Sequence, residues 1–226
     1  MLAFLIAPGA VSVAIAAFLP ARRARAEGLS FAAVRSMLVD RRVVIIGVLL
    51  FVSGASYGLL LGAFRDKIDA RFGSLAVGQV VGVFFVTRLV ISIAGGHFSD
   101  LFARRIVVAL AFFLGGAGLA AAAGLDNLLS LYVASVCLGL VGAVVPVSAT
   151  AYSADWFPAE KRTLAMGSAF LWNDAATAIS LLAGQYIVQA SGGFGASMLV
   201  FGVLFLAATA LSLLIPETRR ADAEAI

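Results

Sequence analysis

Charged side chains are scarce in this chain. Only 12% of its 226 residues are Asp, Glu, Lys or Arg, whereas about a quarter of a soluble domain is charged. Hydrophobic residues make up 62% of the chain. Water is therefore not the main solvent of the folded protein, and this composition is typical of a membrane protein.

Cysteine and histidine each occur once, as Cys137 and His97. A single cysteine excludes a disulfide within the chain, and a single histidine lacks the partners of a metal centre or a proton relay. The sequence has no Gly-rich phosphate loop and no nucleophile paired with a histidine base. We therefore expect no enzyme activity, no metal and no cofactor.

Long apolar runs account for most of the chain. About 20 apolar residues are needed for a helix to cross the hydrocarbon layer, where every backbone polar group must be paired internally. Seven such runs are expected, at residues 2–19, 43–63, 75–94, 106–125, 128–151, 164–188 and 196–215. The sequence thus predicts an all-α, polytopic membrane protein.

The basic residues indicate the orientation of these spans. Positively charged loops stay on the cytoplasmic side of a membrane. Twelve basic residues fall on one side, namely Arg22, Arg23, Arg25, Arg35, Arg41, Arg42, Arg104, Arg105, Lys161, Arg162, Arg219 and Arg220, and three on the other, namely Arg65, Lys67 and Arg71. We expect a cell (inner) membrane protein with its N-terminus outside and its C-terminus in the cytoplasm. The net charge of +4 then reflects topology, and nucleic acid is not an expected partner.

The segment 96–105, with the sequence GHFSDLFARR, resembles the cytoplasmic G-x-L-[AS]-D-R-x-G-R-R signature of the major facilitator superfamily. By this resemblance Gly96, Asp100, Arg104 and Arg105 form a conformational signature. The glycine permits close helix approach, the aspartate pairs with a neighbouring helix end or arginine, and the arginines hold the loop inside.

Three departures from that signature, at Phe98, Leu101 and Ala103, resemble the weaker second copy in the family. The segments 155–162 and 216–219 resemble the turn between its tenth and eleventh helices and the tail after its twelfth. The resemblance implies helices six to twelve, with two inverted three-helix repeats.

The resemblance also divides the chain. We expect a first transmembrane helix at 1–20, a cytoplasmic linker with an interfacial helix at 21–42, a six-helix bundle at 43–215 and a cytoplasmic tail at 216–226. The chain is then a fragment or half-transporter. Its partners would be the lipid bilayer and the N-terminal half of the transporter or a second copy.

Two ionisable residues lie well inside predicted spans and are candidates for function, because charges in lipid are costly. Arg88 lies twelve residues before Asp100. Asp174 lies twelve residues after Arg162. At about 1.5 Å per residue both are roughly 18 Å from the cytoplasmic edge, so they can meet near the midplane. We expect Arg88 to bind an anionic substrate group and Asp174 to exchange a proton; the alternative is an ion pair that only fastens two helices.

Polar neighbours add to this expected site for a substrate or coupling ion. Asn173, Thr177 and Gln185 fall near the helical stripe of Asp174, and Tyr57 lies near the middle of its span. Each could instead form hydrogen bonds between packed helices.

The expected function is secondary active transport of a small solute by alternating access, with proton coupling as one version. A seven-span ligand receptor and an inactive truncated membrane protein remain as alternatives. A retinal protein is not expected, because Lys67 and Lys161 are both predicted in loops and leave no buried Schiff-base lysine.

Overall fold

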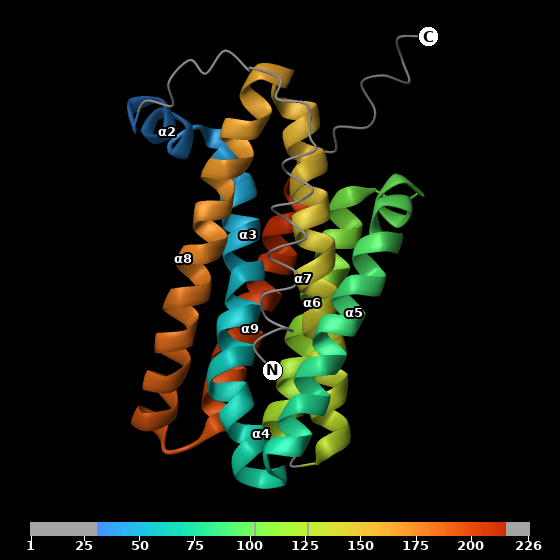
Figure 1. Ribbon diagram of the computed structural model, residues 1–226, viewed down its shortest axis with the longest axis vertical. Coiled ribbons are helices and arrows are strands. Elements are labelled where there is room, and N and C mark those ends of the chain that lie inside the picture. The colour runs from blue at the N-terminus through green and yellow to red at the C-terminus, as the bar shows by residue number, and fades with distance from the viewer. Residues whose placement is uncertain (1–30, 102, 126, 216–226) are drawn as a thin grey trace, which may run out of the picture. The chain divides into compact units, whose positions relative to one another are not determined.

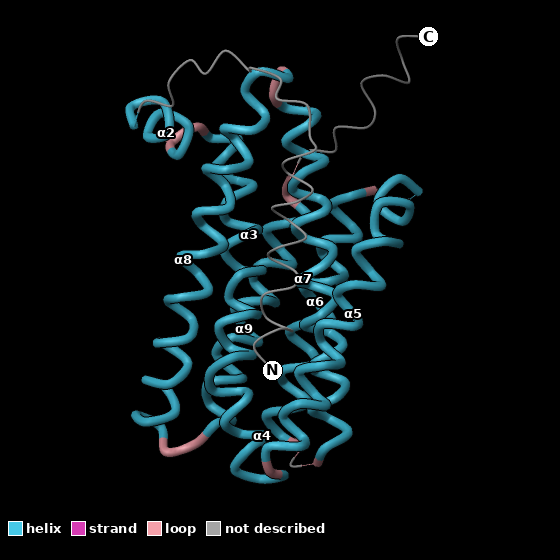
Figure 2. The backbone as a smooth tube through the Cα atoms, viewed as in Figure 1, coloured by secondary structure: helices cyan, strands magenta, loops and turns pink. Residues whose placement is uncertain are grey.

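The computed structural model describes residues 31–101, 103–125 and 127–215, and every regular element in these ranges is a helix (Figure 2). The helices are α2 (Phe31–Leu38), α3 (Arg41–Leu59), the π-helix η1 (Leu60–Phe64), α4 (Arg65–Phe72), α5 (Ser74–Leu101), α6 (Arg104–Gly124), α7 (Leu128–Trp156), α8 (Ala159–Ser191) and α9 (Phe194–Leu213). The all-α prediction is confirmed. The expected span 2–19 and the tail 216–226 lie outside the described residues.

Within the described ranges, five helical segments are long and apolar enough to cross a membrane. They are Arg41–Phe72, Ser74–Ile93, Arg104–Gly124, Leu128–Trp156 and Phe194–Leu213. The chain is therefore a multi-pass membrane protein. The expected run 164–188 lies inside α8, which has 33 residues but is more polar than these five.

The expected span 43–63 ends too early. In the structure α3, η1 and α4 follow one another without a break as far as Phe72, and the backbone bends at Gly62, whose φ and ψ are −104° and −114°. The prediction that Lys67 lies in a loop is wrong. Its side chain is 4% exposed, and its Nζ donates a hydrogen bond to the carbonyl of Ala122 in the last turn of α6. The ammonium is buried because a helix C-terminus attracts a cation.

Local sequence sets where several helices begin and end. The side chain of Asp40 accepts a hydrogen bond from Arg42 N at 2.8 Å and caps α3, and Asn127 caps α7 in the same way. Gly73 and Gly192 end α4 and α8 with φ of 80° and 70°, a left-handed conformation that glycine adopts without strain.

Helix α3 packs along both α8 and α7, while α5 packs on α7 and α6 packs on α9 and α7 (Figure 1). In this view α8 and α5 lie at opposite edges. Apolar side chains such as Leu50, Phe84 and Phe112 are fully buried among these helices. The bundle thus places α3 and α7 between the two helices that carry Arg88 and Asp174.

Glycines let α3 and α8 approach within backbone contact. A Cβ added at Gly54 would lie 2.2 Å from the backbone oxygen of Asn173, and one at Gly58 would lie 2.2 Å from that of Thr177. Both distances are far below a normal contact. Small residues at a four-residue spacing support this kind of packing in membrane helices, where close van der Waals contact replaces the hydrophobic effect.

We expect Gly54→Ala to destabilise the bundle by about 1–3 kcal/mol, because the new methyl group must push α8 away. Gly167→Ala is the matched control on α8: a Cβ there meets nothing within 4 Å, and alanine favours a helix over glycine. Thermal melting of the purified protein in detergent measures both changes. An unchanged melting temperature for Gly54→Ala would contradict the close approach of these helices.

Candidate functional site

The face of α7 that carries small residues holds α5 in place. Ser135 Oγ donates a 2.6 Å hydrogen bond to the carbonyl of Val80 on α5. One turn further along, a Cβ at Gly139 would lie 2.9 Å from the backbone oxygen of Phe84. This narrow crossing brings the next turn of α5, with Arg88, against Gly142.

Arg88 is anchored to a backbone carbonyl that a proline leaves free. Pro146 lies inside α7 and has no N–H to donate to the carbonyl of Gly142, four residues earlier. The Nε of Arg88 donates a hydrogen bond to that oxygen at 3.2 Å. One interaction therefore pairs the carbonyl that the proline leaves free with the Nε–H of the guanidinium, in a membrane-spanning bundle where unpaired polar groups are expensive.

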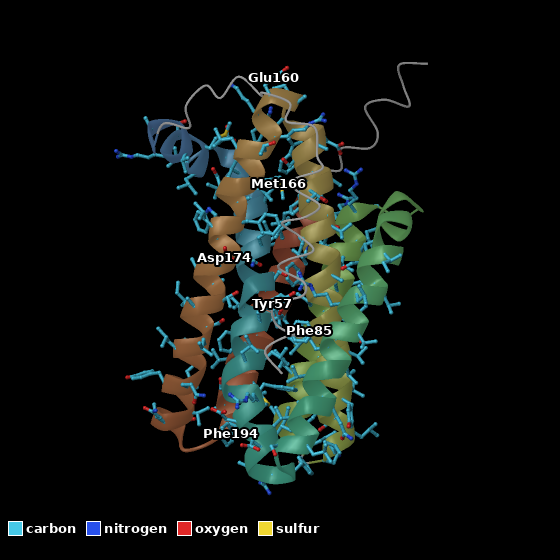
Figure 3. The ribbon with its side chains drawn as sticks, in the orientation of Figure 1. Tyr57, Phe85, Glu160, Met166, Asp174 and Phe194 are labelled. Atoms are coloured by element: carbon cyan, nitrogen blue, oxygen red, sulfur yellow. The ribbon has the colours of Figure 1, made fainter. Side chains whose placement is uncertain are left out.

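Tyr57 on α3 completes this group of residues. The guanidinium carbon of Arg88 lies 4.9 Å from the centre of the Tyr57 ring, in a cation–π contact. Phe84 meets the same ring edge-on, with centroids 5.2 Å apart. The hydroxyl of Tyr57 is buried, and it has no hydrogen-bond partner among the residues described. Figure 3 shows Tyr57 near the middle of the bundle, with Phe85 on the neighbouring α5.

Asp174 lies on α8 and is exposed (Figure 3). Its carboxylate accepts a weak 3.4 Å hydrogen bond from the side-chain amide of Asn173. In the part of the chain that the structure describes, Asp174 and Arg88 form no ion pair with each other. The structure therefore does not bring these two residues together as a fixed pair.

The other polar residues predicted on α8 connect it to neighbouring helices. Thr177 Oγ1 donates to the carbonyl of Gly54 on α3 at 3.1 Å. The amide of Gln185 donates to the carboxylate of Asp66 on α4. These contacts fix the positions of both side chains, and a role for them in substrate binding stays a prediction.

The structure links the two motifs found in the sequence. Gly96 and Asp100 lie in the last turns of α5, and Arg104 begins α6. Arg104 forms an ion pair with Asp155 near the end of α7, while Arg105 beside it is exposed. The motif at 96–105 is thereby joined to the segment 155–162.

Two further arginines bind the end of α7. Arg42 Nη1 donates to the carbonyl of Trp156 at 2.8 Å, and Arg162 Nε donates to that of Phe157 at 2.9 Å. The last carbonyls of a helix lack partners within it and attract cations. Arginines from α3, α6 and α8 therefore meet at residues 155–157.

Sequence reasoning missed the partners of Arg88. The signal for one of them was present, because a proline inside a span frees the carbonyl four residues before it, here Gly142. The ring of Tyr57 could not be found in this way, since the contact depends on how α3 and α5 cross. No sequence spacing reports that crossing.

The arrangement around Arg88 offers hydrogen-bond donors to an anion. Arg88 uses Nε for Gly142, and across the described ranges its two Nη groups have no hydrogen-bond partner. A guanidinium with its Nη groups available binds carboxylates and phosphates in a bidentate manner. Groups of three His, Cys, Asp or Glu residues that could hold a metal ion are absent from the described residues.

Residues 46–225 match the Major Facilitator Superfamily when the chain is compared with known protein families. The match runs from α3 beyond the end of α9 and covers Tyr57, Arg88 and Asp174. A search of curated proteins finds no match. The resemblance inferred from residues 96–105 is confirmed.

A double-mutant cycle tests the anchoring of Arg88. Arg88→Met leaves the carbonyl of Gly142 unpaired and should cost about 1–3 kcal/mol of stability. In a Pro146→Ala background residue 146 regains an N–H for that carbonyl, so the same substitution should cost about 1 kcal/mol less. Unfolding in detergent measures each variant. Gly78→Ala, where a Cβ meets nothing within 4 Å, is the control background; equal costs of Arg88→Met in all backgrounds would refute the anchor.

Proposed function

The chain belongs to the major facilitator superfamily of membrane transporters, and we propose that it works as one bundle of a secondary active carrier. The cargo is a small organic anion or zwitterion. Transport proceeds by alternating access, in which two bundles rock about a site near the midplane.

The observation that carries this proposal is the pair of Nη groups of Arg88, which have no partner among the described residues, beside the buried hydroxyl of Tyr57. Together they offer several donors to one anionic group. The bond from Nε to Gly142 and the stacking on Tyr57 hold the guanidinium before substrate arrives, so little conformational entropy is lost on binding. The edge-to-face contact with Phe84 keeps Tyr57 in position.

Asp174 supplies the coupling in this proposal. An ionised carboxylate facing lipid is costly, so an exposed Asp in a membrane protein faces water or a protein partner. We infer that the face of α8 with Asp174 lines a water-filled path, where the carboxylate takes up and releases a proton. Because Asp174 forms no fixed pair with Arg88 in the described structure, each is available for its own ligand.

A second bundle covers the exposed faces in the functional carrier. On α5, the turns around Arg88 expose Val86, Leu89 and Ile93 by 62–78%. On α8, Leu182 and Tyr186 are exposed by 72% and 73%. Arg88 lies beside the exposed face of α5 and Asp174 beside that of α8. Charged side chains are costly in lipid, so we expect protein to cover these faces. We propose that the N-terminal half of the transporter, or a second copy of this chain, packs there.

Thiol labelling in native membranes tests the environment of Asp174. Maleimides react with thiolates, which form in water and not in lipid. In a Cys137→Ala background, Ala178→Cys, one turn from Asp174 and exposed, should react with a membrane-permeant maleimide. Val203→Cys, which is 65% exposed on apolar α9, is the control and should stay unlabelled. If neither cysteine reacts, water does not reach the Asp174 face and the proposed path is wrong.

Transport into proteoliposomes containing the chain and its partner bundle tests the two charges separately, with a panel of organic anions and zwitterions. Arg88→Ala should raise KM at least about tenfold, the equivalent of a charge-assisted hydrogen bond. Asp174→Asn should abolish accumulation driven by a pH gradient but preserve exchange of labelled for unlabelled substrate.

The matched controls for that assay are Arg65→Ala and Asp69→Asn, which remove exposed charges from α4. Both should transport like the wild type. Wild-type transport by Arg88→Ala and Asp174→Asn as well would falsify the proposed roles of both residues.

A further inference from the structure

A cavity of about 620 Å³ is lined by residues from the first half of α3 and from the ends of α7 and α9. This volume lies in the range of small-molecule sites. Its polar residues are Arg41, Arg42 and Trp156, and the rest of its lining is aliphatic. The cavity is separate from the group formed by Arg88, Tyr57 and Gly142, because none of these three residues lines it.

The two arginines have different roles at the mouth of the cavity. Arg42 is held by its hydrogen bond to the carbonyl of Trp156. Arg41 is exposed, and its guanidinium has no partner in the portion of the chain described here. The nearest acid in sequence, Asp40, accepts a hydrogen bond from Arg42 N and does not line the cavity. The residues that line the cavity therefore carry net positive charge, and one of their two guanidiniums has no partner within the described ranges.

The wall of the cavity is apolar and runs along the helices. On α3 it extends from Arg41 to Leu49, roughly 12 Å at 1.5 Å per residue. Leu211 of α9 and Leu214 directly after that helix, exposed by 50% and 79%, also line the cavity. A ligand that fits has an anionic head at the mouth and an alkyl chain that descends beside the helices. A soluble anion would leave the apolar wall unused.

We propose that this cavity binds an anionic phospholipid. Its phosphate contacts Arg41 and Arg42, and one acyl chain lies between α3 and α9. Basic pockets between membrane helices recognise lipid headgroups in this way. Trp156 suits the same depth, because tryptophan prefers the level of the headgroups. The bound lipid joins the start of α3 to the ends of α7 and α9.

The test is the melting temperature of the purified protein in a neutral detergent with added lipid. Phosphatidylglycerol should raise it in a concentration-dependent way, because a ligand of the folded state stabilises that state. Phosphatidylcholine tests the need for net negative charge, and glycerol 3-phosphate tests whether a headgroup without acyl chains is sufficient. Neither should reproduce the shift.

Two variants locate the effect. Arg41→Gln removes a guanidinium that has no partner in the described part of the chain, and it should weaken phosphatidylglycerol binding about fivefold, the equivalent of one basic residue at a membrane surface. Val48→Trp fills the apolar wall, keeps both arginines and should also weaken binding. Arg105→Gln removes an exposed arginine of α6 that does not line the cavity, and it should bind like the wild type.

Each contrary result overturns the proposal. An equal shift with phosphatidylcholine would show that charge is not recognised, and an equal shift with glycerol 3-phosphate would show a site for soluble phosphate. Phosphatidylglycerol binding that Arg41→Gln and Val48→Trp leave unchanged would place the lipid elsewhere on the protein. None of these results depends on the solute that the carrier moves.

Discussion

The contact of α3 with α8 at Gly54 and Gly58 is the constraint on which the rest of the arrangement depends. Backbone atoms of the two helices meet there without side chains between them, and Thr177 adds a hydrogen bond across the same contact. Helices in lipid gain no hydrophobic stabilisation from each other, so such close packing decides which faces pair. Because the glycine face of α3 is taken by α8, Tyr57 is turned toward α5 and α7. The packing of α3 on α8 therefore also decides where Arg88 lies relative to the ring of Tyr57.

Arg88 shows how a membrane protein keeps a charge inside its bundle at low cost. An arginine there must meet acceptors, and a helix normally offers none, since each carbonyl is bonded to the N–H four residues on. Pro146 has no N–H, so the carbonyl of Gly142 is left without a partner in its own helix and accepts a hydrogen bond from Arg88. The aromatic face of Tyr57 supplies the second partner. A proline in one helix and an arginine in another thus act together, although 58 residues separate them in the sequence.

Five of the seven apolar runs expected from the sequence coincide with helices long and apolar enough to cross a membrane, because span length and hydropathy are local properties. It failed at residues 64–72, where Arg65, Lys67 and Arg71 looked like a loop. The helix continues there because Lys67 donates a hydrogen bond to the carbonyl of Ala122 and Asp66 accepts one from Gln185. Both bonds join segments that are far apart in the chain. The four-residue spacing of Gly54, Gly58 and Gly62 could have been read as a packing face. The partners of Arg88 and Arg104 could not have been predicted from the sequence, since these contacts depend on how the helices cross.

The three arginines that meet at the end of α7 have a mechanical consequence. Arg42, Arg104 and Arg162 bind residues 155–157 from α3, α6 and α8, so four helices share one joint at that end of the bundle. Any displacement of the α7 terminus relative to these neighbours must break or stretch the contacts that the three arginines make. Ten residues earlier, Pro146 removes a hydrogen bond from the same helix and leaves it easiest to bend. The most easily bent point of α7 therefore lies beside Gly142, so bending of this helix would displace the carbonyl that holds Arg88.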